Sequence, residues 1–240
     1  MFKSLFRKMD GLFTGHEQDT NEEEVFFSDV LGYPEIKKLL LKSVVAREPV
    51  HILLTGPPSS SKTVFLLDML HGLDDTYFAD AVSVSSAGMI DYLFNNNTKY
   101  LLIDEIDKMN KSVQATLLNV METGIISETK LNGKTRQKKM KLWIFATSNN
   151  VERLSVALRS RFMELHLDEY PFEEFIEIVR RLLKKRYRLD ANISEKIAYV
   201  WNKMNSKDIR DAINIAKLTK SSADVNWLVD VQMKYGKKII

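Results

Sequence analysis

The first part of the chain alternates short apolar runs with amphipathic segments, beginning at Val25. Runs such as Tyr100–Ile103 are apolar at every position, as in strands that are buried on both faces of a sheet. This alternation predicts strands separated by helices, and therefore a parallel sheet covered by helices on both sides. The expected strands are His51–Thr55, Ala81–Ser85, Tyr100–Asp104, Leu142–Thr147 and the short run Glu164–Leu167.

The pattern changes toward both ends of the chain. From Pro171 the strand pattern stops, and the remaining sequence predicts three or four helices with apolar faces. Residues 1–13 place apolar side chains at helical spacing between basic ones, which favours either a tail packed loosely on its own core or a helix that docks on a partner or a membrane surface. We expect an amphipathic, flexible segment at 1–24, an α/β domain at 25–169 and a helical domain at 170–240.

Composition narrows the function classes. The 240 residues, 45% of them hydrophobic, suffice for one generous domain with a small appendage. The chain has no cysteine, which excludes disulfides and thiolate metal sites, and its four histidines lack the spacing of metal ligands. We find no apolar stretch of about 18 residues and no secretory signal, so we expect a cytoplasmic protein without a membrane span. The net charge of +3 is too small to argue for nucleic-acid binding.

A phosphate-binding pattern follows the first expected strand. Gly56-Pro-Pro-Ser-Ser-Ser-Lys62-Thr63 lies between that strand and the helical pattern Val64–Leu70. Lys62 would reach the β- and γ-phosphates, and the Thr63 hydroxyl would join a Mg²⁺ shell. The pattern asks for glycine where this chain has Ser61, so a loop that binds ATP without hydrolysing it is an alternative, as is a plain polar turn. The expected nucleotide-binding residues here are Gly56, Pro57, Pro58, Ser59, Ser60, Ser61, Lys62, Thr63 and Val64.

A second motif ends another expected strand. Tyr100-Leu-Leu-Ile-Asp104-Glu105 is an apolar run that finishes in two consecutive carboxylates. Its distance along the chain from Lys62 is typical of a neighbouring parallel strand, so the ends of both strands would face one crevice. Asp104 would hold Mg²⁺ through water, and Glu105 would polarise the water that attacks the γ-phosphate. Alone, such a strand end is often solvated or caps a helix. Beside a phosphate loop it indicates ATP hydrolysis.

Together the two motifs resemble those of the AAA+ ATPases, and further matches extend the resemblance over nearly all of residues 25–220. The resemblance implies a three-layer α/β/α P-loop NTPase domain with a parallel sheet, followed by a small all-helical lid. Phe27-Ser-Asp-Val-Leu-Gly-Tyr33, with the expected helix Glu35–Ala46 after it, looks like the family's segment that lines the adenine pocket. The residues that would contact adenine are Val30, Leu31, Gly32 and Tyr33.

Further polar residues are similar to the family's sensor residues, which contact the bound nucleotide, and to its arginine finger, which completes the ATP site of a neighbouring subunit. Asn149 follows an expected strand and looks like the first sensor, with Thr147 as the alternate and a simple loop cap as the alternative role. Arg161 resembles the finger that reaches the γ-phosphate held by a neighbouring subunit, with Arg159 as the second candidate. Arg210 resembles the second sensor, which moves onto the γ-phosphate as the lid closes. For all three arginines, surface ion pairs are the alternative.

A basic hairpin is expected before the first sensor. Two alternating runs flank Asn132-Gly133, a strong short-range hairpin signal. It resembles the hairpin of one AAA+ branch, which includes minichromosome-maintenance helicases, MoxR-type chaperones and the RuvB branch-migration motor. Residues 130–141 would contact nucleic-acid phosphates, or would form a solvated hairpin whose lysines prevent edge pairing. Its basic residues are Lys130, Lys134, Arg136, Lys138, Lys139 and Lys141.

A second pore-facing loop is expected at Ser85–Ile90, and it lacks the aromatic residue that peptide-threading rings use. With the residues that follow, it looks most like the RuvB group, although we expect no counterpart here of that group's winged-helix domain. We therefore expect a homo-oligomeric ring, a hexamer, that hydrolyses MgATP at subunit interfaces and drives a nucleic-acid motor of RuvB or helicase-loader type. Residues 1–13 would dock a protein partner. The alternatives are a MoxR-like protein-remodelling chaperone and an ATP-dependent assembly switch with little turnover.

Overall fold

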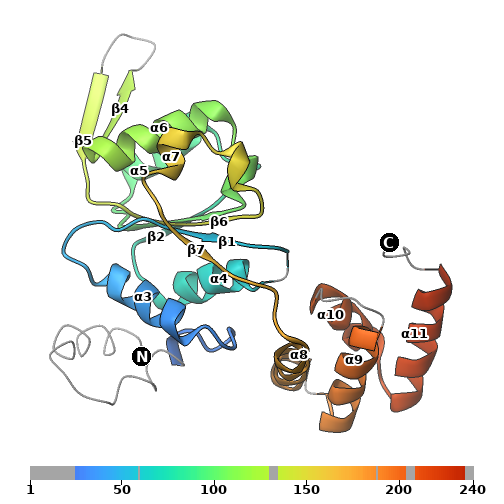
Figure 1. Ribbon diagram of the computed structural model, residues 1–240. Helices are drawn as coiled ribbons and strands as arrows, with labels where there is room; N and C mark the ends of the chain where they lie inside the picture. The colour runs from blue at the N-terminus through green and yellow to red at the C-terminus, as the bar shows by residue number, and fades with distance from the viewer. Residues whose placement is uncertain (1–24, 59, 130–134, 188, 204–208, 236–240) are drawn as a thin grey trace, which may run out of the picture. The chain divides into compact units, whose positions relative to one another are not determined.

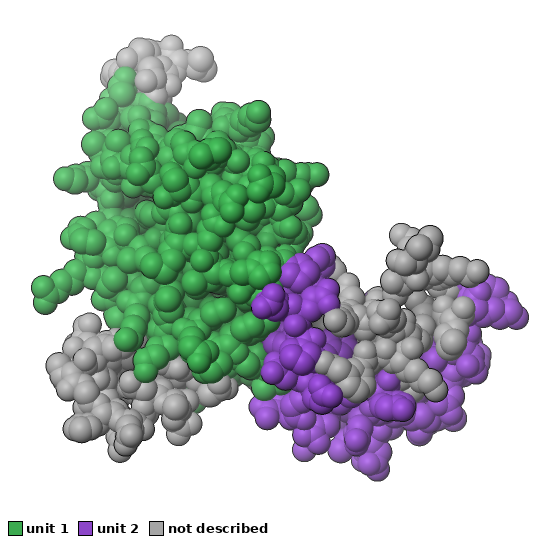
Figure 2. All heavy atoms as spheres, in the orientation of Figure 1, with its two compact units in different colours: residues 1–56, 61–167 green, residues 57–60, 168–240 purple. Residues whose placement is uncertain are grey.

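The computed structural model describes residues 25–58, 60–129, 135–187, 189–203 and 209–235 (Figure 1). The chain divides into two compact units, Met1–Gly56 with Ser61–Leu167, and Pro57–Ser60 with Asp168–Ile240 (Figure 2). Over the described ranges, none of the helices combines the length and the apolar character needed to cross a membrane. The amphipathic helix expected near the N-terminus lies outside the described residues.

The first unit contains a five-stranded parallel sheet with the strand order β2-β3-β6-β1-β7 (Figure 1). Its strands pair in parallel, so their carboxyl ends lie along one edge of the sheet. We expected the strand that ends in Asp104 to neighbour the strand before the phosphate loop. This is wrong, because β6 lies between β1 and β3. Every residue of β6 is buried, which suits this central place. The strands are β1 (Ile52–Thr55), β2 (Thr76–Asp80), β3 (Tyr100–Asp104), β6 (Trp143–Ser148) and β7 (Met163–His166).

Helices cover both faces of this sheet and bury two apolar cores. Successive strand residues point to opposite faces, so that Leu53 belongs to the core under α5 and α6, whereas Leu54 belongs to the core under α3 and α4. The three-layer α/β/α arrangement is thus confirmed. The helices are α3 (Pro34–Val44) and α4 (Lys62–Gly72) on one face, and α5 (Ser86–Asn95), α6 (Lys111–Thr123) and α7 (Val156–Arg159) on the other (Figure 1).

The strand expected at residues 81–85 is wrong, because β2 ends just before it. Asp80 ends the strand in a turn: its carboxylate accepts a hydrogen bond from the backbone N–H of Val82 at 2.9 Å. Ser85 then caps α5 with its side-chain oxygen. The alternating valines and serines therefore belong to a turn and a helix cap. Residues 86–90, expected to lie in a pore-facing loop, form the first turns of α5 instead.

The second unit is helical, as expected. Within the described ranges after Leu167, α9 contacts each of the three other helices. Their apolar faces form the contacts, with Val179 of α8, Ile197 of α9 and Val225 of α11 all buried. The helices are α8 (Phe172–Tyr187), α9 (Ala191–Lys203), α10 (Ile209–Leu218) and α11 (Ser222–Tyr235).

The expected hairpin is present, formed by the antiparallel strands β4 (Ile125–Thr129) and β5 (Thr135–Lys139). Its turn lies outside the described residues. Gly124 sets the base of the hairpin, because it ends α6 in the left-handed conformation with φ 65°. Its carbonyl accepts a hydrogen bond from the N–H of Met140 at 2.8 Å. A Cβ at this position would lie 3.1 Å from the Met140 carbonyl oxygen, so the turn into the hairpin requires glycine.

Candidate functional site

The carboxylate of Asp104 joins three segments at the carboxyl edge of the sheet. Thr63, in the first turn of α4, donates its hydroxyl hydrogen toward both carboxylate oxygens, at 3.0 and 3.1 Å. Thr147, in β6, donates to Asp104 Oδ1 at 2.5 Å. The expected phosphate loop, acidic pair and first-sensor segment therefore meet in space, although they are far apart in the sequence.

Glu105 is held by the end of β6. Its backbone N–H donates to Thr147 Oγ1 at 2.9 Å, and the side-chain amide of Asn149 donates to its carboxylate at 3.4 Å. Both candidates for the first sensor thus contact the acidic pair: Thr147 binds Asp104 and Glu105, and Asn149 binds Glu105. Glu105 also has φ 53°, in the left-handed region that residues other than glycine rarely adopt. Such conformations cluster at functional sites.

Two charged residues beside Glu105 were missing from the sequence-based predictions. Lys108 forms an ion pair with the Glu105 carboxylate. The buried carboxylate of Asp107 accepts a hydrogen bond from the backbone N–H of Asn149 at 3.1 Å. The spacing of Glu105 and Lys108 is the signal that could have found the ion pair, because residues three apart are neighbours on a helical turn.

Lys62 begins α4 and is buried beside the acidic residues. Its Nζ donates a hydrogen bond to the carbonyl of Gly56 at 2.8 Å. Burial lowers the pKa of Lys62 from 10.5 to about 8, and the nearby carboxylates of Asp104, Asp107 and Glu105 oppose this shift. At neutral pH the side chain is therefore still an ammonium ion, placed where it can bind an anion.

Ser61 takes the conformation for which the phosphate-loop pattern requires glycine. Its φ of 62° and ψ of 12° are left-handed, a conformation that costs a residue with a Cβ about 1–2 kcal/mol. Its carbonyl still accepts the first helical hydrogen bond of α4, from Phe65 at 3.1 Å. Ser61 therefore adopts the glycine-type backbone at a conformational cost.

The segment expected to contact adenine packs on α4. Gly32 and Tyr33 are both left-handed, with φ values of 70° and 54°, and turn the chain into α3. Val30 is buried and Leu31 is partly exposed. The Tyr33 ring lies 6.1 Å from the ring of Phe65. The segment is therefore beside the helix that starts at the phosphate loop.

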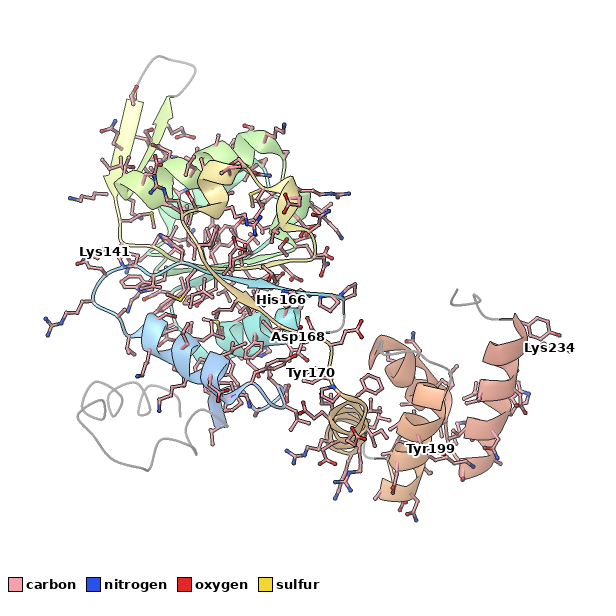
Figure 3. All side chains as sticks on the ribbon, viewed as in Figure 1. Lys141, His166, Asp168, Tyr170, Tyr199 and Lys234 are labelled. Carbon is pink, nitrogen blue, oxygen red and sulfur yellow. The ribbon has the colours of Figure 1, made fainter. Side chains whose placement is uncertain are left out.

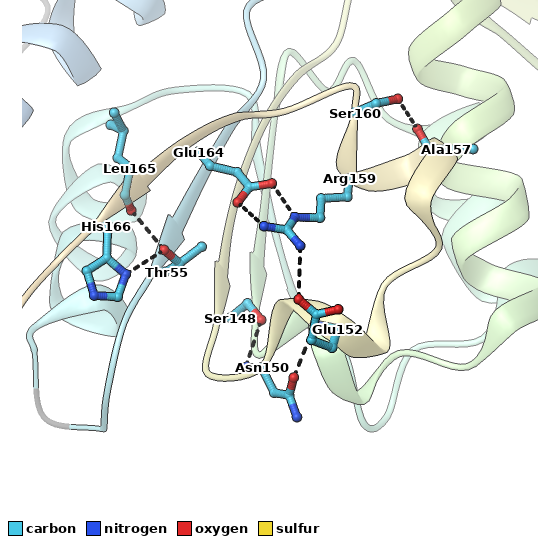
Figure 4. Close-up of polar contacts among 10 residues, drawn as sticks. All are labelled: Thr55, Ser148, Asn150, Glu152, Ala157, Arg159, Ser160, Glu164, Leu165 and His166. Atoms are coloured by element: carbon cyan, nitrogen blue, oxygen red, sulfur yellow. Dashed lines mark hydrogen bonds and ion pairs between the residues drawn. The ribbon is translucent and has the colours of Figure 1, made fainter.

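The ends of β1 and β7 are also joined by side chains. His166, labelled in Figure 3, places its Nδ1 3.1 Å from Oγ1 of Thr55, the residue immediately before the phosphate loop (Figure 4). No sequence motif predicted this contact. It follows from the parallel register, which pairs the two residues directly.

Both arginine-finger candidates form ion pairs. Arg159 donates to the Glu164 carboxylate at 2.6 and 3.0 Å and to Glu152 at 3.2 Å (Figure 4). Arg161 contacts Glu122 at 2.5 Å, and its side chain is 48% exposed. Two carboxylates therefore fix Arg159, whereas Arg161 is bound by one in the described part of the chain.

For some predicted site residues, the residue or its side chain lies outside the part of the chain that the structure describes. Arg210 is the second residue of α10, but its side chain is not among those described. The loop residues Pro57, Pro58 and Ser60 are described, and Ser60 donates a hydrogen bond to the Pro57 carbonyl at 2.9 Å. The predicted residues outside the described ranges are Ser59, Lys130, Lys134 and segment 1–13.

Comparison with known proteins connects this geometry to one family. A family model described as AAA domain (dynein-related subfamily) matches residues 69–162. RuvB, the Holliday junction branch migration complex subunit, from Wolbachia pipientis wMel is 32% identical over 156 residues, covering 62% of this chain and 47% of that protein. Over these residues the chain is similar to an AAA domain and to RuvB. RuvB from Ehrlichia canis (strain Jake) is 28% identical over 158 residues, covering 62% of this chain and 48% of that protein. The chain thus spans about half the length of these curated relatives.

Solved RuvB structures share the fold. A RuvB variant from Thermotoga maritima has a TM-score of 0.68 and 24% identity, over 88% of this chain and 75% of that chain. The Holliday junction branch migration motor RuvB of the same organism has a TM-score of 0.63 and 21% identity, over 87% of this chain and 73% of that chain. The residues that match the AAA domain model include Asp104, Glu105, Thr147, Asn149 and both finger candidates.

We expect Ser61→Gly to stabilise the protein slightly. Relief of about 1–2 kcal/mol of left-handed strain exceeds the roughly 0.4–1 kcal/mol that the greater freedom of glycine in the unfolded chain costs. Urea denaturation should show a higher free energy of unfolding, by less than about 1 kcal/mol. Ser60→Gly is the matched control, because Ser60 has no positive φ and donates a hydrogen bond, so its loss should destabilise. A Ser61→Gly variant less stable than the unchanged protein would contradict this account.

Proposed function

We propose that this chain hydrolyses MgATP and uses the free energy to move or remodel nucleic acid, as a RuvB-like motor. The observation that carries the proposal is the cluster in which Asp104 accepts hydrogen bonds from Thr63 and Thr147. Phosphoryl transfer needs the phosphate loop, the acidic pair and a water-positioning residue within reach of one phosphate group. The cluster brings these parts of the chain together, which supports the proposal.

The donor set at this cluster fits Mg²⁺. The Thr63 hydroxyl and the Asp104 carboxylate are both oxygen ligands, and they lie 3.0 Å apart. This cation prefers oxygen ligands and takes one or two from the protein, with the rest from phosphates and water. Thr63 would bind the ion directly and Asp104 through water. Held by these residues, the ion would supply Lewis-acid stabilisation of the charge that develops on the phosphates.

The neighbouring residues take the remaining roles. Lys62 exchanges its hydrogen bond to the Gly56 carbonyl for the β- and γ-phosphate oxygens of ATP. Glu105 accepts a hydrogen bond from the attacking water and polarises it. Asn149 holds the Glu105 carboxylate in place through its amide group. The segment Val30–Tyr33 contacts adenine.

We propose that the site is completed by a neighbouring subunit in a ring of six. We choose Arg161 as the arginine finger. Its ion pair with Glu122 is about half exposed, and such surface pairs contribute only about 0–1 kcal/mol to stability. A γ-phosphate at the subunit interface can therefore displace Glu122. Arg159 instead orders the surface by binding Glu152 and Glu164. The helical lid, which we assign to residues 170–240, would supply Arg210 as a second sensor.

Nucleic acid is the substrate we favour. The matching relatives are named as subunits of the Holliday junction branch migration complex. The hairpin region 130–141 supplies basic residues, of which Lys139 is exposed. A MoxR-like chaperone would use the same ATP site, so the response to DNA separates the two. The strain at Ser61 favours the assembly switch as a second candidate. We also propose a cytoplasmic location and a protein partner for residues 1–13.

Steady-state ATP hydrolysis with single-stranded, duplex and four-way-junction DNA tests this function. We expect DNA to stimulate turnover, and the stimulation to fade as salt rises, because phosphate contacts release counterions. Glu105→Gln should lower kcat by about 10²–10⁴-fold, and Arg161→Ala by about 10³-fold or more, while both keep ATP binding. A basal rate indifferent to every DNA would favour a protein substrate, and no hydrolysis would favour the switch.

We expect ATP affinity to fall above pH 8. The free protein loses the Lys62 proton with a pKa of about 8, whereas bound phosphates favour the ammonium form. Binding above that pH therefore takes up a proton, and the Kd should rise by up to about tenfold per pH unit. Calorimetry with ATP and EDTA between pH 7.5 and 9, in buffers of different ionisation enthalpy, measures both the Kd and the proton uptake.

Lys62→Arg is the control, since a guanidinium keeps its charge throughout this pH range. Its affinity should be nearly independent of pH, whatever its absolute value. A Kd of the unchanged protein that stays constant between pH 7.5 and 9 would contradict the role of Lys62.

A further inference from the structure

Strand β5 presents its basic residues on two different faces. Along Thr135–Lys139 the side chains alternate between exposed and half-buried positions, with Arg136 and Lys138 on the half-buried side and Lys139 on the exposed side. Successive residues of a strand point in opposite directions, so this division is built into the backbone. The basic residues of β5 therefore do not form one common surface.

Lys138 binds the end of α5. Its Nζ donates hydrogen bonds to the carbonyls of Leu93 at 2.8 Å, Phe94 at 3.3 Å and Asn96 at 2.8 Å. The last carbonyls of a helix lack partners within the helix and carry partial negative charge, which an ammonium group satisfies. All three donors of the ammonium group are thus matched by acceptors of α5 and its cap. Lys138 joins the hairpin to this helix.

Arg136 makes a second connection between the same elements. Its guanidinium contacts Asp91 of α5 at 3.1 Å and Glu128 of β4 at 2.6 Å. It also lies 4.2 Å from the ring centre of Phe94, so that α5 provides an aromatic face as well as a carboxylate. A guanidinium bound in this way has exchanged the phosphate-binding capacity of its fork for contacts within the chain.

Lys139 differs from both neighbours. Among the residues that the structure describes, its exposed side chain takes part in no hydrogen bond or ion pair. The next base along the chain, Lys141, is bound to Glu48 at 2.5 Å (Figure 3). Of the described bases between 135 and 141, Lys139 is therefore the one whose charge faces solvent without a partner in the described part of the chain.

The other end of α5 is connected to the ATP site. Asp80, at the end of β2, is paired in register with Asp104 of β3. The backbone N–H of Ala81 donates to the Asp104 carbonyl at 3.3 Å, and Ser85 then caps α5. A short turn thus separates the carboxylate that holds Thr63 from the helix that holds the hairpin.

We propose that Arg136 and Lys138 are positioning residues that fix the hairpin to α5, so that it moves with the Asp104 end of the sheet, while Lys139 binds nucleic-acid phosphate. This inference rests on the proposed function. It assigns different roles to basic residues that the sequence analysis placed in one group. Lys138 acts through α5. Its removal lowers the stimulation of ATP turnover by DNA without removing a contact to DNA.

The test compares Lys138→Met with Lys139→Met, which remove the same charge from adjacent residues on opposite faces. Three quantities are measured on the full chain: basal ATP turnover, turnover at saturating single-stranded DNA, and the slope of log affinity against log salt. Lys139→Met should reduce the slope by about 0.7, the value for one phosphate contact on a single strand, and keep the stimulation at saturation. Lys138→Met should keep the slope and the basal rate and lose most of the stimulation.

Lys138→Arg separates coupling from general damage, because it keeps a charged donor at the end of α5. We expect it to restore much of the stimulation. A reduction of the slope in Lys138→Met as large as in Lys139→Met would overturn the inference, because Lys138 would then be a phosphate contact. Unchanged stimulation in Lys138→Met would also overturn it.

Hydrogen exchange without DNA tests the attachment of the hairpin to α5 separately from the proposed function. We expect Lys138→Met to speed exchange of the last-turn amides of α5 and of the hairpin amides several-fold, and Lys139→Met to leave them unchanged. If no DNA stimulates the unchanged protein, the proposed function fails, and this exchange comparison decides on the hairpin attachment alone. Equal exchange in the two variants would then refute the attachment.

Discussion

The hydrogen bonds to the Asp104 carboxylate are the interaction on which the rest of the site depends. Because β6 lies between β1 and β3, the phosphate loop and the acidic pair are not on adjacent strands. Thr63 spans that separation from the start of α4, and Thr147 of β6 binds the same carboxylate between them. Hydrogen bonds to an ionised acceptor are stronger than neutral ones. The positions of Lys62 and Glu105, each adjacent in sequence to one of these residues, follow from this arrangement.

Of the four left-handed residues with a Cβ in the described ranges, three lie at predicted site positions, and the fourth is Asp75. Tyr33, Ser61 and Glu105 are left-handed residues with a Cβ, and each lies at a predicted nucleotide-binding or catalytic position. Each conformation costs about 1–2 kcal/mol, so the surrounding structure must hold it in place. The two apolar cores on either side of the sheet provide that rigidity. A backbone shaped in this way before any ligand binds reduces the ordering that binding requires.

The sequence predicted the parts whose signals are local. The buried strand that ends in Asp104, the hairpin around Asn132-Gly133 and the sheet covered on both faces were all found from residue patterns. The strand expected at 81–85 was wrong because a side-chain turn at Asp80 overrides a pattern that alternates like a strand. The placement of β6 and the partners of Arg136 and Lys138 depend on contacts between distant segments, which no local pattern contains. The roles of the site residues stay predictions, supported by their convergence on Asp104.

The most direct test of the central claim is the affinity for ATP with Mg²⁺ and with EDTA, measured by calorimetry on the unchanged protein and on Asp104→Asn. The account predicts that the unchanged protein binds ATP at least about tenfold more tightly with Mg²⁺, a difference of about 1.4 kcal/mol. It predicts that Asp104→Asn loses this preference while still binding metal-free ATP through Lys62. Equal affinities with and without Mg²⁺ in the unchanged protein, or a full preference in Asp104→Asn, would contradict the assignment of Asp104 as the residue around which the site is built.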